Sequence, residues 1–211
     1  MKTITFDIET KPNQELIDIC LSNLKAPKNI KDPEKIKANL DAQKAELAKK
    51  MSVDPDFCEI RCIGVKIDDE PAKIVSLQEF MDIINEQVKV KSELGSEYIE
   101  RSLGWKLISF NGKKFDLQVI IRQGLREGID GPYKELKEMT KRFQSTKHID
   151  LLEAINDNEW RSLDVYCQIY LGETKKPIDF ETCSQEELEE HCLDDCEKSY
   201  KLYAFFKPML I

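Results

Sequence analysis

Near its amino terminus the chain carries Thr3-Ile-Thr-Phe-Asp-Ile-Glu9, in which polar and apolar residues alternate strictly. This alternation predicts a β-strand with three apolar side chains on one face and the polar ones on the other. Asp7 and Glu9 share the polar face, with their carboxylates about 7 Å apart along the strand. Such a pair is either ordinary solvated polarity or a pair of ligands that converges on a cation.

The segments that follow this strand alternate between helical and extended patterns. Residues 12–50 have helical periodicity, with Asp32 as an N-cap and Pro33 at the first helical position. Strands are expected over 60–67 and 72–77, so the first three strands should form an antiparallel meander. The later elements are expected to be one broken helix or two over 78–104, a strand over 106–110, a helix over 114–127, a short strand over 147–151 and a helix over 161–171. The last helix is expected to open with the capping box Ser184-Gln-Glu-Glu187 and to end near residue 206, which completes an α/β fold with a mixed sheet and helices on its faces.

Composition is that of an ordinary globular protein. Of the 211 residues, 41% are hydrophobic and 34% are charged, which is enough apolar material for a core without disulfides. The seven scattered cysteines favour free thiols in a reducing compartment. No signal-peptide pattern and no uncharged run near ~18 residues is present, so a cytoplasmic location without membrane contact is expected. The net charge of −8 argues at first against nucleic acid as a partner, because Lys and Arg bind phosphates.

A second candidate acid follows the strand expected over 106–110. The segment Phe110-Asn-Gly-Lys-Lys-Phe-Asp116 turns from that strand into a helix and places Asp116 in the first helical turn. A carboxylate there complements the helix dipole, which is the structural interpretation. It also lies beyond a strand end, where open α/β sheets bind ligands.

The third candidate site is Glu190-His-Cys-Leu-Asp-Asp-Cys196 on the last helix. At 100° per residue, Asp195 shares an apolar stripe with Leu188 and therefore points inward, whereas Asp194 lies about 100° away. A buried carboxylate needs a partner, and a metal ion would serve. His191 borders the same stripe one turn earlier. Zinc binding by this histidine and the two cysteines is a minor alternative, because neighbouring thiols on a helix usually fill the core.

Together these segments resemble a known family. Phe6-Asp-Ile-Glu-Thr10, Asn111-x-x-x-Phe-Asp116 and His191-x-x-x-Asp195 are similar to the three motifs of the DEDD 3′-5′ exonucleases. More narrowly, they resemble stand-alone exonucleases related to the proofreading domain of family-B DNA polymerases, as do the stretches 26–36, 54–57 and 163–172. The resemblance implies a ribonuclease-H-like fold with a five-stranded mixed sheet. It also implies one exonuclease domain over 1–211 with a helical insertion at about 12–52.

The resemblance further implies the composition of the site. Four acids are expected to bind two divalent cations, Mg²⁺ or Mn²⁺: Asp7, Glu9, Asp116 and Asp195. His191 is the candidate general base, at the spacing of the family's Tyr subgroup, and a structural role is the alternative. Substrate contacts are expected from the neighbouring motif residues Thr10, Asn111, Lys113, Lys114 and Phe115.

Basic residues are concentrated around the second motif. Residues 101–150 hold 11 Lys and Arg against 6 Asp and Glu, so the acidic total hides a cationic segment. Further candidates for phosphate contacts there are Arg122, Lys141, Arg142 and Lys147. The expected activity is hydrolysis of single-stranded DNA from its 3′ end, with replication or repair proteins as candidate partners. The alternatives are a 3′-5′ exoribonuclease, or a nuclease-like module that binds nucleic acid or a protein with little or no catalysis.

Several other residues receive structural interpretations. His148 is expected to be a structural histidine in the short strand over 147–151. Asp150 and Asp164 are expected to face solvent or to cap. The two tryptophans, Trp105 and Trp160, are expected to belong to the core, with stacking on nucleic-acid bases as the alternative.

Overall fold

A five-stranded mixed sheet forms the centre of the protein. The structure is a computed structural model, and it describes residues 2–25, 31–51, 53–85, 87–91, 97–101, 105–142, 145–155, 160–180 and 182–210. The strand order is β3-β2-β1-β6-β7. β1 (Lys2–Pro12) pairs antiparallel with β2 (Cys58–Ile67), and β2 pairs antiparallel with β3 (Lys73–Val75). On its other side β1 pairs parallel with β6 (Trp105–Ser109), which pairs parallel with β7 (His148–Asp150). The predicted meander and the predicted mixed sheet are confirmed.

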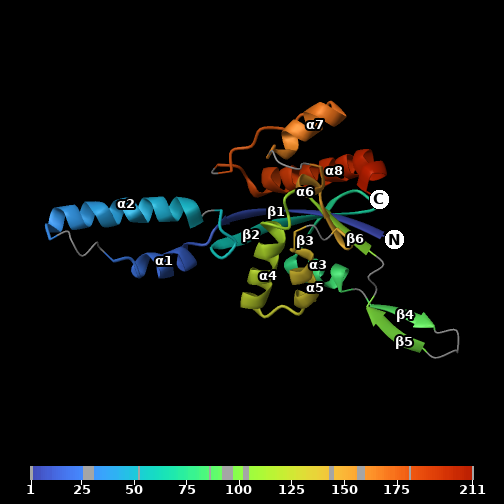
Figure 1. Ribbon diagram of the computed structural model, residues 1–211, viewed down its shortest axis with the longest axis horizontal. Coiled ribbons are helices and arrows are strands. Elements are labelled where there is room, and N and C mark those ends of the chain that lie inside the picture. Colours follow the sequence, from blue (N-terminus) through green and yellow to red (C-terminus); the bar gives the residue numbers. More distant parts are fainter. Residues whose placement is uncertain are drawn as a thin grey trace.

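Helices cover both faces of this sheet (Figure 1). On one face lie α3 (Leu77–Ile84), α4 (Asp116–Glu127) and α5 (Tyr133–Met139). On the other lie α6 (Leu151–Ile155), α7 (Leu163–Leu171) and α8 (Gln185–Leu210). The apolar residues of β1, Ile4, Phe6 and Ile8, are buried in the core beneath α3, α4 and α5. Because strand residues alternate in direction, Asp7 and Glu9 are turned toward α8.

The segment between β1 and β2 is helical, as predicted. It contains α1 (Gln14–Ser22) and α2 (Pro33–Met51), which extend from one end of the sheet as a helical arm (Figure 1). Asp32 Oδ1 accepts a hydrogen bond from Glu34 N at 3.0 Å, as expected of an N-cap. Residues 26–30, part of one stretch that resembles the exonuclease family, lie outside the described residues.

The prediction of one broken helix or two over 78–104 is wrong for most of the described residues in this stretch, which exclude 86, 92–96 and 102–104. α3 ends at Ile84, and β4 (Gln87–Lys91) pairs antiparallel with β5 (Glu97–Arg101) in a hairpin. Residues 87–91 alternate valine with polar residues, and this period of two with β-branched side chains favours a strand. Residues 102–104 lie outside the described part of the chain. The short helices α5 and α6 were not predicted, because seven and five residues are too few to show a helical period.

α8 lies close against β1 and β2. The predicted capping box is confirmed, since Ser184 Oγ accepts from Glu187 N at 3.1 Å and Glu187 Oε2 accepts from Ser184 N at 2.9 Å. Gly64 permits the close approach, because a Cβ atom there would lie 2.8 Å from Cys196 Sγ. The approach brings the inward face of α8 over the polar face of β1. Among the described residues, no helix is both long and apolar enough to cross a membrane.

Candidate metal centre

β1 and α8 bring three potential metal ligands together. Glu9, His191 and Asp195 each offer one ligand atom, and these atoms all lie within 4.8 Å of one another. His191 Nε2 is 3.8 Å from Glu9 Oε1 and 3.9 Å from Asp195 Oδ2. The helical periodicity predicted that Asp195 points inward, and the structure confirms that it is buried while the neighbouring Asp194 is half-buried.

Asp7 and Asp116 lie beside these three residues. The charges that act on the Asp7 carboxylate come from Asp116, Asp195 and Glu9, with Lys175 as the opposing cation. Cys192 Sγ on α8 donates to the backbone oxygen of Asp7 at 3.5 Å, which links β1 to the helix. The structure therefore brings all four predicted acids into one cluster, called here the carboxylate cluster (Asp7, Glu9, Asp116 and Asp195).

A hydrogen-bonded turn holds Asp116 at the start of α4. Asn111 has a positive φ of 65°, and its N–H donates to Asp150 Oδ1 at 2.8 Å. Asp150 Oδ2 accepts from Lys113 N at 3.0 Å. The prediction that Asp150 caps is confirmed, whereas the alternative of solvent exposure is wrong because its carboxylate is buried under this turn.

His148 completes the support of the turn from β7. Gly112 N donates to Ser109 Oγ at 3.2 Å, and Ser109 Oγ lies 2.8 Å from His148 Nε2. His148 Nδ1 lies 3.2 Å from the oxygen of Met139, an acceptor, so Nδ1 carries the proton and Nε2 accepts from the serine. Burial lowers the pKa of His148 to about 3, so the ring is neutral at pH 7. The predicted structural role is confirmed.

The crowded acids resist ionisation when no cation accompanies them. Burial, together with the charges of Asp116 and Asp195, raises the pKa of Asp7 well above its usual range. Burial also raises the pKa of Glu9 to about 7 and that of Asp116 to about 7. The pKa of Asp195 is raised by burial, against the lowering effect of Lys175. The pKa of His191 is lowered by burial, although Asp195 opposes that shift.

Lys175 is a site residue that the sequence did not reveal. Its ammonium pairs with Asp195 Oδ2, and both side chains are largely buried. The segment that carries it is anchored on two helices: Lys175 N donates to Asp164 Oδ1 at 2.8 Å, and Lys198 Nζ donates to Thr174 O at 3.0 Å. Asp164, expected to face solvent or to cap, is half-buried and anchors this loop, while Ser162 is the N-cap of α7. Residues 172–184 have no helical or strand period, so no pattern in them pointed to the cluster.

The cluster suits a divalent cation. Asp195 Oδ1 is buried and has no hydrogen-bond partner within the described residues, so it retains an unsatisfied acceptor. Four carboxyl groups lie near the ammonium of Lys175, so a bound cation would favour the ionised form of acids that otherwise resist ionisation. Carboxylate oxygens are the ligands that Mg²⁺ and Mn²⁺ prefer. The four acids fit such an ion, with His191 Nε2 within reach of the same position.

The predicted substrate residues occupy different environments. Thr10, Asn111 and Phe115 are half-buried next to the acids, and Lys114 is exposed. Lys113 is buried, with Nζ 3.2 Å from Glu153 Oε2, so its ammonium neutralises a carboxylate of the protein rather than facing solvent.

Two other basic candidates pair with acids at the surface, Arg122 with Asp56 and Lys141 with Glu138. Trp105 is in the core as predicted, whereas Trp160 is 73% exposed, so the prediction for that residue is wrong.

Three buried thiols lie behind the acids. Cys62 on β2 packs with Cys192 on α8, and Cys196 lies one turn further along the helix. Among the described residues no group of three ligands includes a cysteine, so the arrangement gives no support to a zinc site. The thiols fill the narrow space between the sheet and α8.

The sheet order is consistent with the ribonuclease-H-like exonuclease fold. Two of the acids lie on the central strand β1, a third lies at the start of α4, and the fourth lies on the buried face of α8. Residues 56–209 match the family described as "Predicted 3'-5' exonuclease related to the exonuclease domain of PolB", and the chain belongs to this family. The match includes Asp116, His191 and Asp195 and begins after the two acids of β1. No curated protein matched the chain. The predicted fold and family are confirmed, and the chain is a predicted 3′-5′ exonuclease domain.

Proposed function

We propose that the protein hydrolyses single-stranded DNA from its 3′ end in a reaction that depends on two divalent cations, Mg²⁺ or Mn²⁺. The observation that carries this proposal is the convergence of Glu9, His191 and Asp195 within 4.8 Å, with Asp7 and Asp116 beside them. The relation of the family to the exonuclease domain of PolB supports DNA as the substrate.

Asp7, Glu9, Asp116 and Asp195 would hold the two ions. Divalent ions bound to oxygen ligands neutralise a phosphodiester, activate water and stabilise the leaving 3′-oxygen. The residues contribute a rigid arrangement for this purpose. Asp116 is fixed by the turn under Asp150, and Asp195 is held between His191 and Lys175.

His191 is the proposed proton acceptor. Its Nε2 faces Glu9 and Asp195, so the ring nitrogen points into the cluster where water would attack the phosphorus. Phe180 packs edge-on against the imidazole, with ring centroids 5.5 Å apart, which restricts the orientation of the ring. A base fixed within reach of the attacking water would take its proton at Nε2 as the new P–O bond forms and the P–O bond to the leaving 3′-oxygen breaks.

Single-stranded DNA suits the position of the site. The 3′ end must separate from a complementary strand before its last phosphodiester lies across the acids. A cavity of about 710 Å³ lies next to His191, between α8 and the described residues of 173–183.

A 5′-labelled oligonucleotide provides the test. With Mn²⁺, the wild-type protein should produce a 3′-to-5′ ladder, and EDTA should abolish it. Asp195→Asn should also abolish it, because it removes a ligand charge while keeping the side-chain volume. Asp194→Asn is the matched control: Asp194 pairs with Lys198 at 2.5 Å outside the carboxylate cluster, and this variant should retain the ladder.

The same assay separates the alternatives. Uncut DNA retained by the wild-type protein would contradict the proposal and favour a binding module. A ladder from RNA but not from DNA would assign an exoribonuclease. His191→Gln should slow cleavage by at least about a hundredfold if His191 is the base.

A further inference from the structure

A β-bulge places an arginine beside the carboxylate cluster. The pairing of β1 with β2 shifts register after Glu9, which pairs with Cys62, whereas Thr10 pairs with Ile60. Arg61 is therefore the extra residue on β2. Bulges of this kind redirect side chains and occur often next to active sites.

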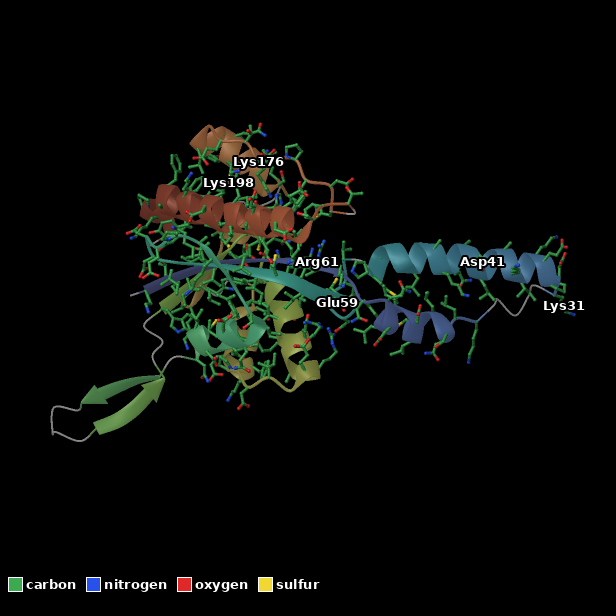
Figure 2. The ribbon with its side chains drawn as sticks, turned by 180° about the vertical axis from the view of Figure 1, so that it is seen from behind. Lys31, Asp41, Glu59, Arg61, Lys176 and Lys198 are labelled. Carbon is green, nitrogen blue, oxygen red and sulfur yellow. The ribbon has the colours of Figure 1, made fainter. Side chains whose placement is uncertain are left out.

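The bulge lets two consecutive side chains of β2 lie on the face of the sheet that α8 covers. Regular alternation would turn one of them to the opposite face. Cys62 packs against Leu188 and Cys192 on α8, and Arg61 Nη2 lies 3.4 Å from Gln185 Oε1 at the start of the same helix. Gln185 Nε2 in turn lies 3.4 Å from Arg61 O. Figure 2 shows Arg61 where β2 meets the helical arm.

The guanidinium of Arg61 retains N–H donors that can bind an anion. Its contact with Gln185 is long and involves one of its two terminal nitrogens, and a guanidinium has five N–H donors. The nearby Glu59 already binds Lys11 at 2.8 Å and Asn13 at 2.8 Å. Burial raises the pKa of Glu9 to about 7, and the positive charge of Arg61 is among the charges that oppose this rise, so the guanidinium lies near that carboxyl.

The opposite flank of the site is less suited to phosphates. Acids outnumber lysines among the described residues that line the cavity next to His191: five acids, including Glu187, Glu190 and Asp194, against two lysines. Of these lysines, Lys198 is paired with Asp194. Lys198 belongs to α8 and Lys176 lies beside that helix, both on its side away from the sheet (Figure 2). Arg61, in contrast, lies on the sheet next to Glu9 and Thr10.

We propose that Arg61 binds a backbone phosphate of the nucleic-acid strand that the carboxylate cluster cleaves, at a linkage other than the scissile one. This inference rests on the proposed function, because it names a contact of the same substrate. A planar guanidinium at a bulge offers two parallel donors to one phosphate, which suits a strand of any sequence.

The experiment measures binding of fluorescein-labelled single-stranded DNA by anisotropy in Ca²⁺, with gels to verify that the strand stays intact. One charged linkage at a time is replaced by a neutral methylphosphonate, counting from the 3′ end. Arg61→Gln should weaken binding about tenfold and reduce the slope of log K against log salt by about 0.7. Arg61→Lys should keep the salt slope and lose part of the affinity, because it retains the charge without the paired donors.

The decisive result is the combination of variant and modified strand. At one linkage, the methylphosphonate should weaken binding by the wild-type protein and have no further effect on Arg61→Gln. Lys73→Gln, which removes one exposed charge from the edge strand β3, is the control. Its effect on the binding free energy should simply add to that of the methylphosphonate at every linkage, without coupling. A purely structural role for Arg61 would lower thermal stability without this coupling.

Additive effects at every linkage, or no strand binding by the wild-type protein, would overturn the inference. Hydrolysis in Mn²⁺ is measured on the same proteins. Coupling without hydrolysis would leave the Arg61 contact in place and contradict the proposed function, whereas hydrolysis without coupling would contradict the Arg61 contact alone.

Discussion

Replacing Lys175 by methionine tests how the charge of the carboxylate cluster is balanced. The ammonium pairs with Asp195 Oδ2, with side-chain exposures of 19% and 10%. Breaking a fully buried ion pair costs about 3 to 5 kcal/mol, because the remaining charge is left without a partner. The partial exposure of this pair reduces the expected loss of unfolding free energy to about 2 to 3 kcal/mol in metal-free protein.

Divalent cations should reduce that loss. Ions bound to the four acids neutralise the charge that Lys175 otherwise opposes, so Lys175→Met should cost only about 1 kcal/mol in saturating Mn²⁺. Thermodynamic linkage then requires tighter metal binding by the variant. A difference of about 1.4 kcal/mol between the two conditions corresponds to a tenfold lower Kd for Mn²⁺.

Urea unfolding in EDTA and in Mn²⁺, together with calorimetric titration of Mn²⁺, measures both quantities. Lys201→Met is the control, because Lys201 pairs with Glu173 at 2.7 Å on the surface. Its loss should stay below about 1 kcal/mol and be independent of metal. An equal loss for Lys175→Met with and without metal, or weaker Mn²⁺ binding, would refute the assignment of Lys175 as a counter-charge to the cluster.

Three further predictions concern the supporting structure. The pKa of His148 is lowered to about 3 in the folded protein, so the unfolded state binds more protons as the pH falls below 6.5. The unfolding free energy of the protein therefore falls by about 1.4 kcal/mol per pH unit below 6.5 because of this one residue. His148→Gln should remove that part of the slope in urea unfolding measured from pH 6.5 to pH 4.5. An unchanged slope would contradict a buried neutral ring. Asp150→Asn should weaken Mn²⁺ binding in calorimetry, because the turn that holds Asp116 loses one of its two carboxylate acceptors and meets an NH₂ donor in its place. Unchanged affinity would show that this turn does not position the acid. Gly64→Ala should lower the unfolding free energy by about 1 to 3 kcal/mol in thermal unfolding, since the added methyl group would meet Cys196 Sγ at 2.8 Å. Cys196→Ala in the same protein should recover part of this loss. A neutral effect of Gly64→Ala alone would argue against close packing of α8 on β2.

Local periodicity was sufficient to predict the acids of the site. One buried face imposes a period of two on β1, and this placed Asp7 and Glu9 together on the other face. The helical period of α8 distinguished Asp195 from Asp194. Both predictions rest on apolar neighbours within a few residues, which a single sequence displays directly.

Residues placed by tertiary contacts were not predictable in the same way. Lys175 reaches Asp195 because Asp164 and Lys198, on two different helices, hold an irregular segment. Arg61 shares a face with Cys62 because of a register shift that depends on both strands. Such contacts join residues far apart in sequence, and no local period encodes them.

Unlike Lys175 and Arg61, Asp150 and the β4–β5 hairpin lie in segments whose local sequence pattern does carry information about their structure. Asp150 lies between apolar neighbours in a short strand, and three residues are too few to separate a buried acid from an exposed one. The alternation over 87–91 favours a strand, although it directly follows the apolar helical pattern of α3.

Sulfur substitution at the reacting phosphate tests most directly whether metal ions held by the acids act on it. A strand whose last linkage carries sulfur at one non-bridging oxygen is compared with the unmodified strand in Mg²⁺ and in Mn²⁺. We predict that one of the two stereoisomers is cleaved at least about tenfold more slowly in Mg²⁺ and that Mn²⁺, which accepts sulfur more readily, restores most of the rate. Equal cleavage of both strands in EDTA, or no cleavage of the unmodified strand with either metal, would contradict a metal-dependent exonuclease.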